Sequence, residues 1–444
     1  MITKAVILIP PRPGSLVHSE YLSPLTFVGG LPIILRVLYS AQWAGISEGV
    51  VLSYGDWPEI RALLAKNPKL HGFECIEHPL PGQDAPKGQA LAKMLNSPFI
   101  LLSSQWMLDR KVIHELCRRD DALEGGILIE GNRPYPSGVL PPACLLDGSQ
   151  HKDLVGALLR GDDIHTVSGL LRAKGHGQIQ SYAPPLLIRT HTREDRKEGE
   201  RELFKGLIKP SESFMSRFFE RRVSLAITRR LLYTSVTPNQ ISIFSILLGV
   251  LSGLFFFPQP RAFHITGALL LLFSSIIDGC DGELARLRFQ ESKWGSWIDF
   301  LGDNLVHMTV FFCIGMGLYR QGQGPVYLAL GIVGALGTLG SASMVFYRVF
   351  LKGRGRVITF ATPVRVEEME KAGGDLRRRI DFADKISNRD FIYVLIAFSI
   401  LGWLRLWAWF CGVGVMFYFF NLLSLYLRMR SLPSGSEQAP ASPD

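Results

Sequence analysis

The sequence predicts a soluble α/β domain followed by an all-α membrane domain of six transmembrane helices. In the first half, short apolar runs alternate with helical patterns. The second half contains apolar runs of about 20 residues, the length that crosses about 30 Å of hydrocarbon. A hydrophobic content of 47% and a mean hydropathy of +0.19 are also high for a wholly soluble protein.

The first domain is assigned to residues 1–197, where four short apolar runs predict buried strands. Runs of this length separated by helical stretches favour βαβ units and a parallel sheet. The expected strands cover residues 5–9, 49–52, 99–102 and 126–129.

Residues 198–237 predict a charged linker and an amphipathic juxtamembrane helix. Within this segment, residues 214–232 hold five arginines against one acid, Glu220, which suits a helix on an anionic membrane surface. The alternative is an ordinary amphipathic helix packed on the soluble domain. The arginines are Arg217, Arg221, Arg222, Arg229 and Arg230.

The membrane domain is assigned to residues 238–430, and the polar tail 431–444 is expected to be disordered. The last two spans are separated by a short turn at Gly402, so one long kinked segment is an alternative. The six spans are expected near residues 239–257, 262–284, 294–319, 325–350, 390–405 and 407–428.

The distribution of basic residues predicts that the N-terminal domain and the connection between the second and third spans lie on the cytoplasmic side. Arginine and lysine gather between the second and third spans and in residues 352–385, which agrees with the positive-inside tendency. The net charge of +9 by itself fits nucleic acid, anionic lipid or an anionic substrate. Membrane lipid is expected as a partner and nucleic acid is not. The six cysteines form no C-x-x-C pair, which argues against a zinc site or a disulfide scaffold.

Four aspartates lie in or at the ends of two apolar spans. Asp278 and Asp281 are three residues apart, and Asp299 and Asp303 are four apart, so each pair shares one helical face. Four anions in one cage repel each other unless cations neutralise them. Two hard divalent cations, Mg²⁺ or Mn²⁺, are therefore expected. The plainer alternative is that these carboxylates are solvated at helix ends.

This segment resembles the signature of the CDP-alcohol phosphatidyltransferase family, D-x-x-D-G-x-x-A-R-x8-G-x-x-x-D-x-x-x-D. The resemblance extends over about residues 209–430 and includes the entry motif Thr237-Pro238-Asn239. The specified positions are filled by Asp278, Asp281, Gly282, Ala285, Arg286, Gly295, Asp299 and Asp303.

The resemblance implies an enzyme that transfers a substituted phosphoryl group from a CDP-linked donor to an alcohol acceptor and releases CMP. It implies that all four aspartates surround the metals and that Asp303 takes the proton from the acceptor hydroxyl. Arg348 and Arg389 are candidates for holding a phosphate on the acceptor, although interfacial snorkelling explains them equally well. The family also suggests a homodimer. The residues expected near CDP are Asn239, Asp278, Gly282, Ala285, Arg286 and Gly295.

The N-terminal half resembles the Rossmann-like sugar-phosphate nucleotidyltransferases through residues 4–10, 29–47 and 50–60. Where that family uses a Gly-rich loop, an aspartate metal motif and further aspartates, this chain departs from the pattern. A catalytically inactive domain is therefore predicted. The departures are Pro10, Pro11 and Pro13, the stretch Ser103-Ser104-Gln105-Trp106, and the stretch Arg189-Thr190-His191-Thr192.

Three functions stay open at this point. The first is a phosphotransferase, with CDP-diacylglycerol or a polar CDP-alcohol such as CDP-inositol as donor, acting in phospholipid or related head-group synthesis. The second is a bifunctional enzyme that also makes its own CDP-alcohol from CTP. The third is a non-enzymatic membrane scaffold or a transporter that uses the acidic pocket for ions.

Overall fold

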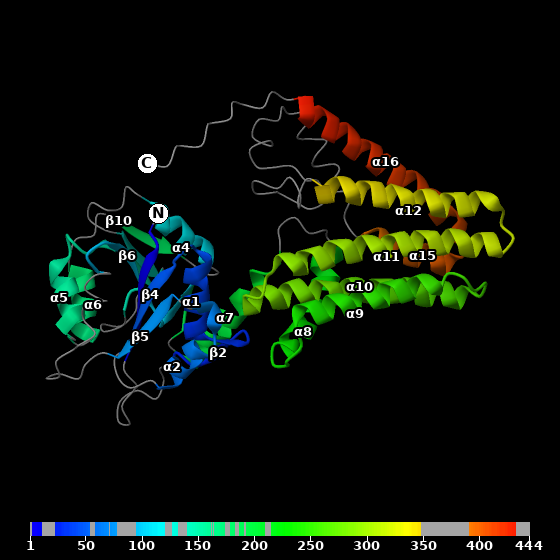
Figure 1. The fold of residues 1–444 in the computed structure, drawn as a ribbon. Coiled ribbons are helices and arrows are strands. Elements are labelled where there is room, and N and C mark those ends of the chain that lie inside the picture. Colours follow the sequence, from blue (N-terminus) through cyan, green and yellow to red (C-terminus); the bar gives the residue numbers. More distant parts are fainter. Residues whose placement is uncertain are drawn as a thin grey trace. The chain divides into compact units, whose positions relative to one another are not determined.

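The chain forms two compact units in the computed structural model (Figure 1). The first is Met1–Leu207 with Leu287–Phe289, and the second is Ile208–Arg286 with Gln290–Asp444. The structure describes residues 2–10, 23–53, 58–70, 72–77, 95–119, 127–131, 140–160, 162, 164–173, 178–182, 186–190, 192–208, 215–347 and 390–431.

A seven-stranded sheet forms the centre of the first unit, in the order β10-β8-β9-β6-β1-β4-β5. The four strands expected from the sequence are confirmed as β1, β4, β6 and β8. Two further sheets are small: β2 (Phe27–Val28) pairs with β3 (Leu31–Pro32), and β7 (Trp106–Leu108) pairs with β11 (Leu187–Arg189). The large sheet consists of β1 (Lys4–Ile9), β4 (Glu48–Ser53), β5 (Phe73–Glu77), β6 (Pro98–Ser103), β8 (Ile127–Gly131), β9 (Ala143–Asp147) and β10 (Gln178–Tyr182).

The expectation of a parallel sheet is wrong at β9. This strand runs antiparallel to both β6 and β8, whereas β1, β4, β5 and β6 pair in parallel. Only residues 132–142 separate β8 from β9. A parallel crossover needs a dozen or more residues, so this connection favours the antiparallel return.

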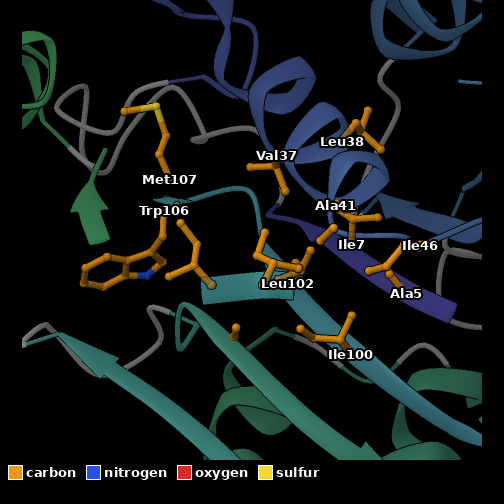
Figure 2. Packing of buried hydrophobic residues seen from close by; sticks show 14 of the residues in the cluster. Ala5, Ile7, Val37, Leu38, Ala41, Ile46, Ile100, Leu102, Trp106 and Met107 are labelled. Carbon is orange, nitrogen blue, oxygen red and sulfur yellow. The ribbon is translucent and has the colours of Figure 1, made fainter. Parts of the chain in front are cut away.

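Helices cover both faces of the sheet because successive strand residues point to opposite sides. On one side, Ala5 and Ile7 pack with Leu38 of α1 (Ile33–Trp43), and α2 (Pro58–Ala65) and α4 (Arg110–Cys117) join them (Figure 2). On the other side, Val6 and Leu8 belong to a cluster with α5 (Lys152–Arg160) and α6 (Ile164–Ala173).

The charged stretch after residue 197 continues a helix of the first unit. α7 (Arg193–Lys205) packs against β11 and buries Gly199 and Phe204. Its first turn is closed by a capping box between Thr192 and Asp195. The first unit therefore extends to Leu207, about ten residues beyond the boundary expected at 197.

The second unit is helical. Four of its described helices, α10, α11, α12 and α16, are long and apolar enough to cross a membrane, and α9 and α15 are shorter. The predicted count of six spans is therefore not confirmed. The elements are η3 (Ser216–Glu220, π-helical), α8 (Arg221–Leu231), α9 (Pro238–Leu254), α10 (Arg261–Arg288), α11 (Lys293–Arg320), α12 (Pro325–Phe346), α15 (Phe391–Leu401) and α16 (Leu404–Ser431).

The chain breaks between α15 and α16 instead of forming one kinked helix. Gly402 ends α15 with a φ of 75°, a left-handed conformation that glycine adopts without strain. Within the unit, α11 packs against both α9 and α12, and α12 also packs against α16 (Figure 1).

The glycines of α12 serve close helix packing, because small residues let helices approach each other closely. A Cβ on Gly331 would lie 3.0 Å from the Cα of Gly315 in α11, and one on Gly334 would lie 3.3 Å from Phe311 Cβ. The other two glycines, Gly337 and Gly340, face Val415 and Phe419 of α16.

Candidate active site

Three of the four signature aspartates converge from α10 and α11. One carboxylate oxygen from each of Asp278, Asp299 and Asp303 lies within 4.8 Å of the others, so the group could hold a metal ion. Asp278 is buried, and the other two are partly exposed. Three hard oxygen donors at the end of an apolar bundle fit a divalent cation such as Mg²⁺ or Mn²⁺.

The start of α11 fixes the approach of Asp299 and Asp303. Ser292 caps this helix, and its Oγ accepts a hydrogen bond of 2.9 Å from the backbone N–H of Gly295. A regular helix from Lys293 onward then brings Asp299 and Asp303 onto one face, four residues apart. Asp299 and Asp303 thus share one helical face, as their spacing predicts.

Asp281 differs from the four-carboxylate cage expected from the sequence. It is buried, and among the described acidic residues it is not part of the converging group. Its Oδ2 accepts a short hydrogen bond from the hydroxyl of Ser242 in α9. Asp281 is still close enough to Asp278 and Asp303 for their negative charges to repel. The hydrogen bond from α9 therefore holds the Asp281 carboxylate beside the three converging aspartates.

The residues expected around CDP lie near these aspartates on α9, α10 and α11. A Cβ on Gly295 would lie 3.3 Å from Asn239 Oδ1, so these two positions are brought together. A Cβ on Gly282 would lie 3.2 Å from Arg286 Nη1, which places the guanidinium against the bare backbone of α10. Ala285 lies in the same turn of α10 and is half-buried. Arg348 and Arg389 lie outside the described residues.

A pocket next to the carboxylates was not anticipated from the sequence. Asp278 and Asp303 line it together with Ser245, Ser274 and His307, which come from α9, α10 and α11. Ser274 is four residues before Asp278, and His307 is four residues after Asp303. The signal in the sequence that could have indicated this pocket is the pair of polar residues one helical turn away from the aspartates.

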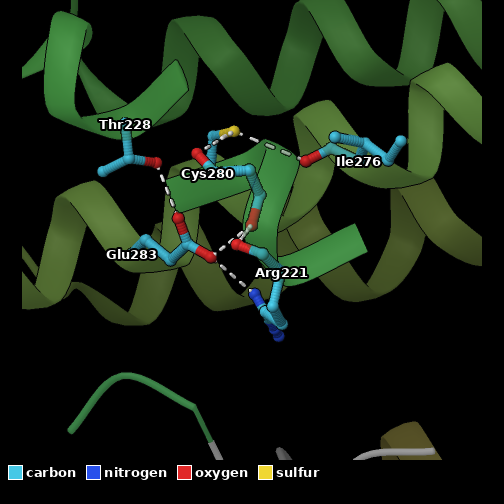
Figure 3. Close-up of polar contacts among 6 residues, drawn as sticks. Arg221, Thr228, Ile276, Cys280 and Glu283 are labelled. Carbon is cyan, nitrogen blue, oxygen red and sulfur yellow. Dashed lines mark hydrogen bonds and ion pairs between the residues drawn. The ribbon is translucent and has the colours of Figure 1, made fainter. Parts of the chain in front are cut away.

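Sequence reasoning also missed a buried ion pair between α8 and α10. Glu283, whose side chain is fully buried, accepts hydrogen bonds at Oε1 from Arg221 (2.8 Å) and Ser224 (2.6 Å). At Oε2 it accepts a bond of 2.7 Å from Thr228 (Figure 3). The three donors stand at positions i, i+3 and i+7, on one face of α8. Arg221 was expected at a lipid surface, but its side chain is only 17% exposed.

In the first unit, the positions that replace the expected catalytic residues make structural contacts. Trp106 Nε1 donates to the carbonyl of Leu140 (2.9 Å), whose own N–H donates to Gln105 Oε1 (3.1 Å). Thr190 Oγ1 donates to the carbonyl of Gln105 (2.7 Å), and Arg189 pairs with Asp195. Ser103 and Ser104 are buried. Residues 11–22, which include Pro11 and Pro13, lie outside the described part, as does His191.

Residues 235–363 match the sequence model of the family described as CDP-alcohol phosphatidyltransferase. The C-terminal unit therefore carries a domain of this family, and its long apolar helices make the chain an integral membrane protein.

Two curated relatives and one solved structure show how far the similarity extends. The Archaeoglobus fulgidus "Bifunctional IPC transferase and DIPP synthase" is 39% identical over 317 residues, covering 66% of this chain and 62% of that protein. The Pyrococcus horikoshii "Archaetidylinositol phosphate synthase" is 31% identical over 91 residues, covering 20% and 47%. A Mycobacterium tuberculosis phosphatidylinositol phosphate synthase with CDP-DAG bound has 16% identity and a TM-score of 0.34, covering 49% of this chain and 98% of that chain.

This chain therefore spans less than two thirds of the length of either curated relative. The domain assignment holds for the matched residues.

Proposed function

We propose that the C-terminal unit is a divalent-metal-dependent CDP-alcohol phosphotransferase. The observation that carries this proposal is the convergence of Asp278, Asp299 and Asp303 within 4.8 Å, inside the residues that match the family. Three mutually repelling carboxylates at the end of an apolar bundle have no structural role in a scaffold. Metal-assisted phosphoryl transfer requires such a group to bind its metal ions.

The carboxylates divide the work by position. Asp278, Asp281 and Asp299 would hold two divalent cations, which would neutralise the acidic group and polarise the diphosphate of the donor. Asp303, which lies with Asp278 and Asp299, accepts the proton of the acceptor hydroxyl. The hydroxyl oxygen forms a bond to the β-phosphorus of the donor. The bond between that phosphorus and the oxygen bridging it to the α-phosphate breaks, and CMP leaves with this oxygen.

The name of the Pyrococcus relative, an archaetidylinositol phosphate synthase, supports an inositol-type alcohol or phosphate as acceptor. The proposed donors are CDP-inositol and CDP-diacylglycerol. Arg348 and Arg389 are included as candidates for binding a phosphate on that acceptor.

The test follows CMP release by purified full-length protein with Mg²⁺ or Mn²⁺, a panel of CDP-alcohols and candidate acceptors. The wild type should release CMP, chelation by EDTA should stop it, and either ion should restore it. Asp303→Asn removes the proton acceptor and should lower the rate by at least about a hundredfold. Glu194→Gln removes an exposed carboxylate of α7, far in sequence from the aspartates, and should keep the rate within about twofold. A wild-type rate in Asp303→Asn would refute the proposal.

The second candidate is a bifunctional enzyme, because the Archaeoglobus relative carries that word in its name. For this chain an inactive first unit is favoured, since Gln105 and Trp106 are engaged in backbone-directed hydrogen bonds where a metal motif is expected. The measurement is pyrophosphate release from CTP by the full chain with inositol phosphate or a sugar phosphate. Turnover of CTP would establish the bifunctional enzyme.

We also propose that the first unit and the aspartate site face the cytoplasm and that the membrane helices form a homodimer. Arg286, Arg288 and Lys293 at the α10–α11 connection support this orientation through the positive-inside tendency. Labelling of an engineered cysteine at Glu291 in sealed vesicles tests the orientation. Cross-linking in membranes tests the dimer.

A further inference from the structure

Two guanidinium groups lie on the glycine face of α10, next to the signature aspartates. Arg221 Nη1 would be 3.1 Å from a Cβ on Gly279, and Arg286 Nη1 would be 3.2 Å from a Cβ on Gly282. Gly279 directly follows Asp278, and Gly282 directly follows Asp281. Gly279 and Gly282 are three residues apart and share one face of α10. The two guanidinium groups therefore lie about one helical turn apart along that face, one from α8 and one from α10 itself.

The two positive charges influence each other, and like charges need a compensating group. Arg286 lies within the electrostatic range of Arg221 and of three acids, Glu283, Glu291 and Asp281. Glu283 pairs directly with Arg221. These acids supply the compensation, so what favours a bound phosphate is the position of the two guanidinium groups on the glycine face.

Glu283 also fixes the orientation of Arg221. Ser224 and Thr228 of α8 donate to the same carboxylate of Glu283 (Figure 3). Glu283 therefore holds α8, and with it the backbone of Arg221, in place. The contact from Arg221 to Glu283 uses Nη1 and ties that end of the guanidinium to α10. A planar guanidinium in a fixed orientation suits phosphate oxygens better than a mobile point charge.

The matched family region begins at residue 235, so Arg221 lies outside it. We propose that Arg221 is a second diphosphate-binding residue, acting beside Arg286, and that Glu283 is the positioning residue that holds it. This inference rests on the proposed function, because the diphosphate is that of the nucleotide donor. The charged helix α8 thereby belongs to the substrate site.

Direct binding of CDP to the full-length protein in detergent with Mg²⁺ tests the inference. Arg221→Gln should weaken CDP binding about tenfold, the effect of losing one charge-assisted hydrogen bond. Binding of cytidine, which has no phosphate, should change less than about twofold. Arg221→Lys keeps the charge but loses the fork and should weaken CDP binding by about threefold. The matched control is Arg222→Gln, an exposed neighbour on the same helix, which should bind CDP like the wild type.

A purely structural role makes different predictions. If Arg221→Gln lowers the unfolding midpoint but binds CDP with wild-type affinity, the inference is overturned. If Arg221→Gln does not fold, wild-type CDP affinity in Arg221→Lys overturns it as well, because the geometry of the fork is the claim. CDP binding that falls equally in Arg222→Gln would show a general charge effect and also overturn it. Wild-type protein that neither binds CDP nor releases CMP would reject both the inference and the proposed function.

Discussion

The contact between α11 and α12 makes a quantitative prediction for Gly315→Ala. A Cβ at this position would lie 2.5 Å from the carbonyl oxygen of Tyr327, 2.7 Å from the Cα of Gly331 and 2.9 Å from its backbone nitrogen. All three are backbone atoms, which cannot rotate away. Since ordinary Cβ contacts begin near 3.4 Å, the two helices must separate locally by roughly 0.5–1 Å.

The expected loss is the overpacking energy less the gain in helix propensity. Overpacking a close contact costs about 1–3 kcal/mol, and replacing glycine by alanine inside a helix returns up to about 1 kcal/mol. The matched control is Gly414→Ala in α16, where the new methyl group would meet nothing within 4 Å. Because the propensity gain is common to both variants, Gly315→Ala should be about 1–3 kcal/mol less stable than Gly414→Ala.

Reversible unfolding in mixed detergent micelles, followed by helical circular dichroism, measures both variants against the wild type. Gly414→Ala should equal or slightly exceed the wild type. If Gly315→Ala is as stable as Gly414→Ala, the close backbone contact between α11 and α12 does not exist as described. The same result would remove the packing explanation for Gly331.

Two further substitutions test buried polar contacts in the two units. Thr228→Val removes the hydroxyl that donates to Glu283 Oε2 (2.7 Å) and should destabilise the second unit by about 1–3 kcal/mol in detergent unfolding, because a buried carboxylate oxygen loses its donor. Asp195→Asn weakens the bonds from Arg189 and Thr192 and should destabilise the first unit by about 1–2 kcal/mol at pH 7 in thermal unfolding. Burial raises the pKa of Asp195, but the bonds from Arg189 and Thr192 outweigh it, so the pKa lies below its usual value. The ionised Asp195 carboxylate therefore stabilises the folded first unit above about pH 4. This stabilisation is lost as the pH falls through the lowered pKa of Asp195.

Each of these has a control with the same chemistry at an exposed site. Thr266→Val removes an exposed hydroxyl bonded to Ala262 and should change stability by less than about 0.5 kcal/mol. Asp162→Asn weakens a surface pair with Arg160 and should leave the unfolding midpoint close to that of the wild type. Equal losses in Thr228→Val and Thr266→Val would contradict the buried contact. A gap between Asp195→Asn and the wild type that persists undiminished at pH 2 would contradict the pKa argument.

The sequence by itself determined the division into an α/β half and a membrane half, because strand and span lengths are set by the runs of apolar residues. It also determined that Asp299 and Asp303 share one face of their helix, whereas their convergence with Asp278 depends on how α10 and α11 pack. The period of the helix places residues four apart on one face, and glycine and serine at the start of α11 define where that helix begins. The fixed spacing of the signature identified this segment without any knowledge of the packing.

Only the tertiary structure decided the partners of the remaining charges. Asp281 is bonded to Ser242, 39 residues away, and Arg221 is paired with Glu283, 62 residues away. Spacing within one helix carries no information about which face of a second helix will meet it. The direction of β9 was undetermined for a related reason, since an apolar run reads the same in parallel and antiparallel pairing. Local pattern thus specified the elements and the aspartate faces, and long-range packing specified which charges are buried together.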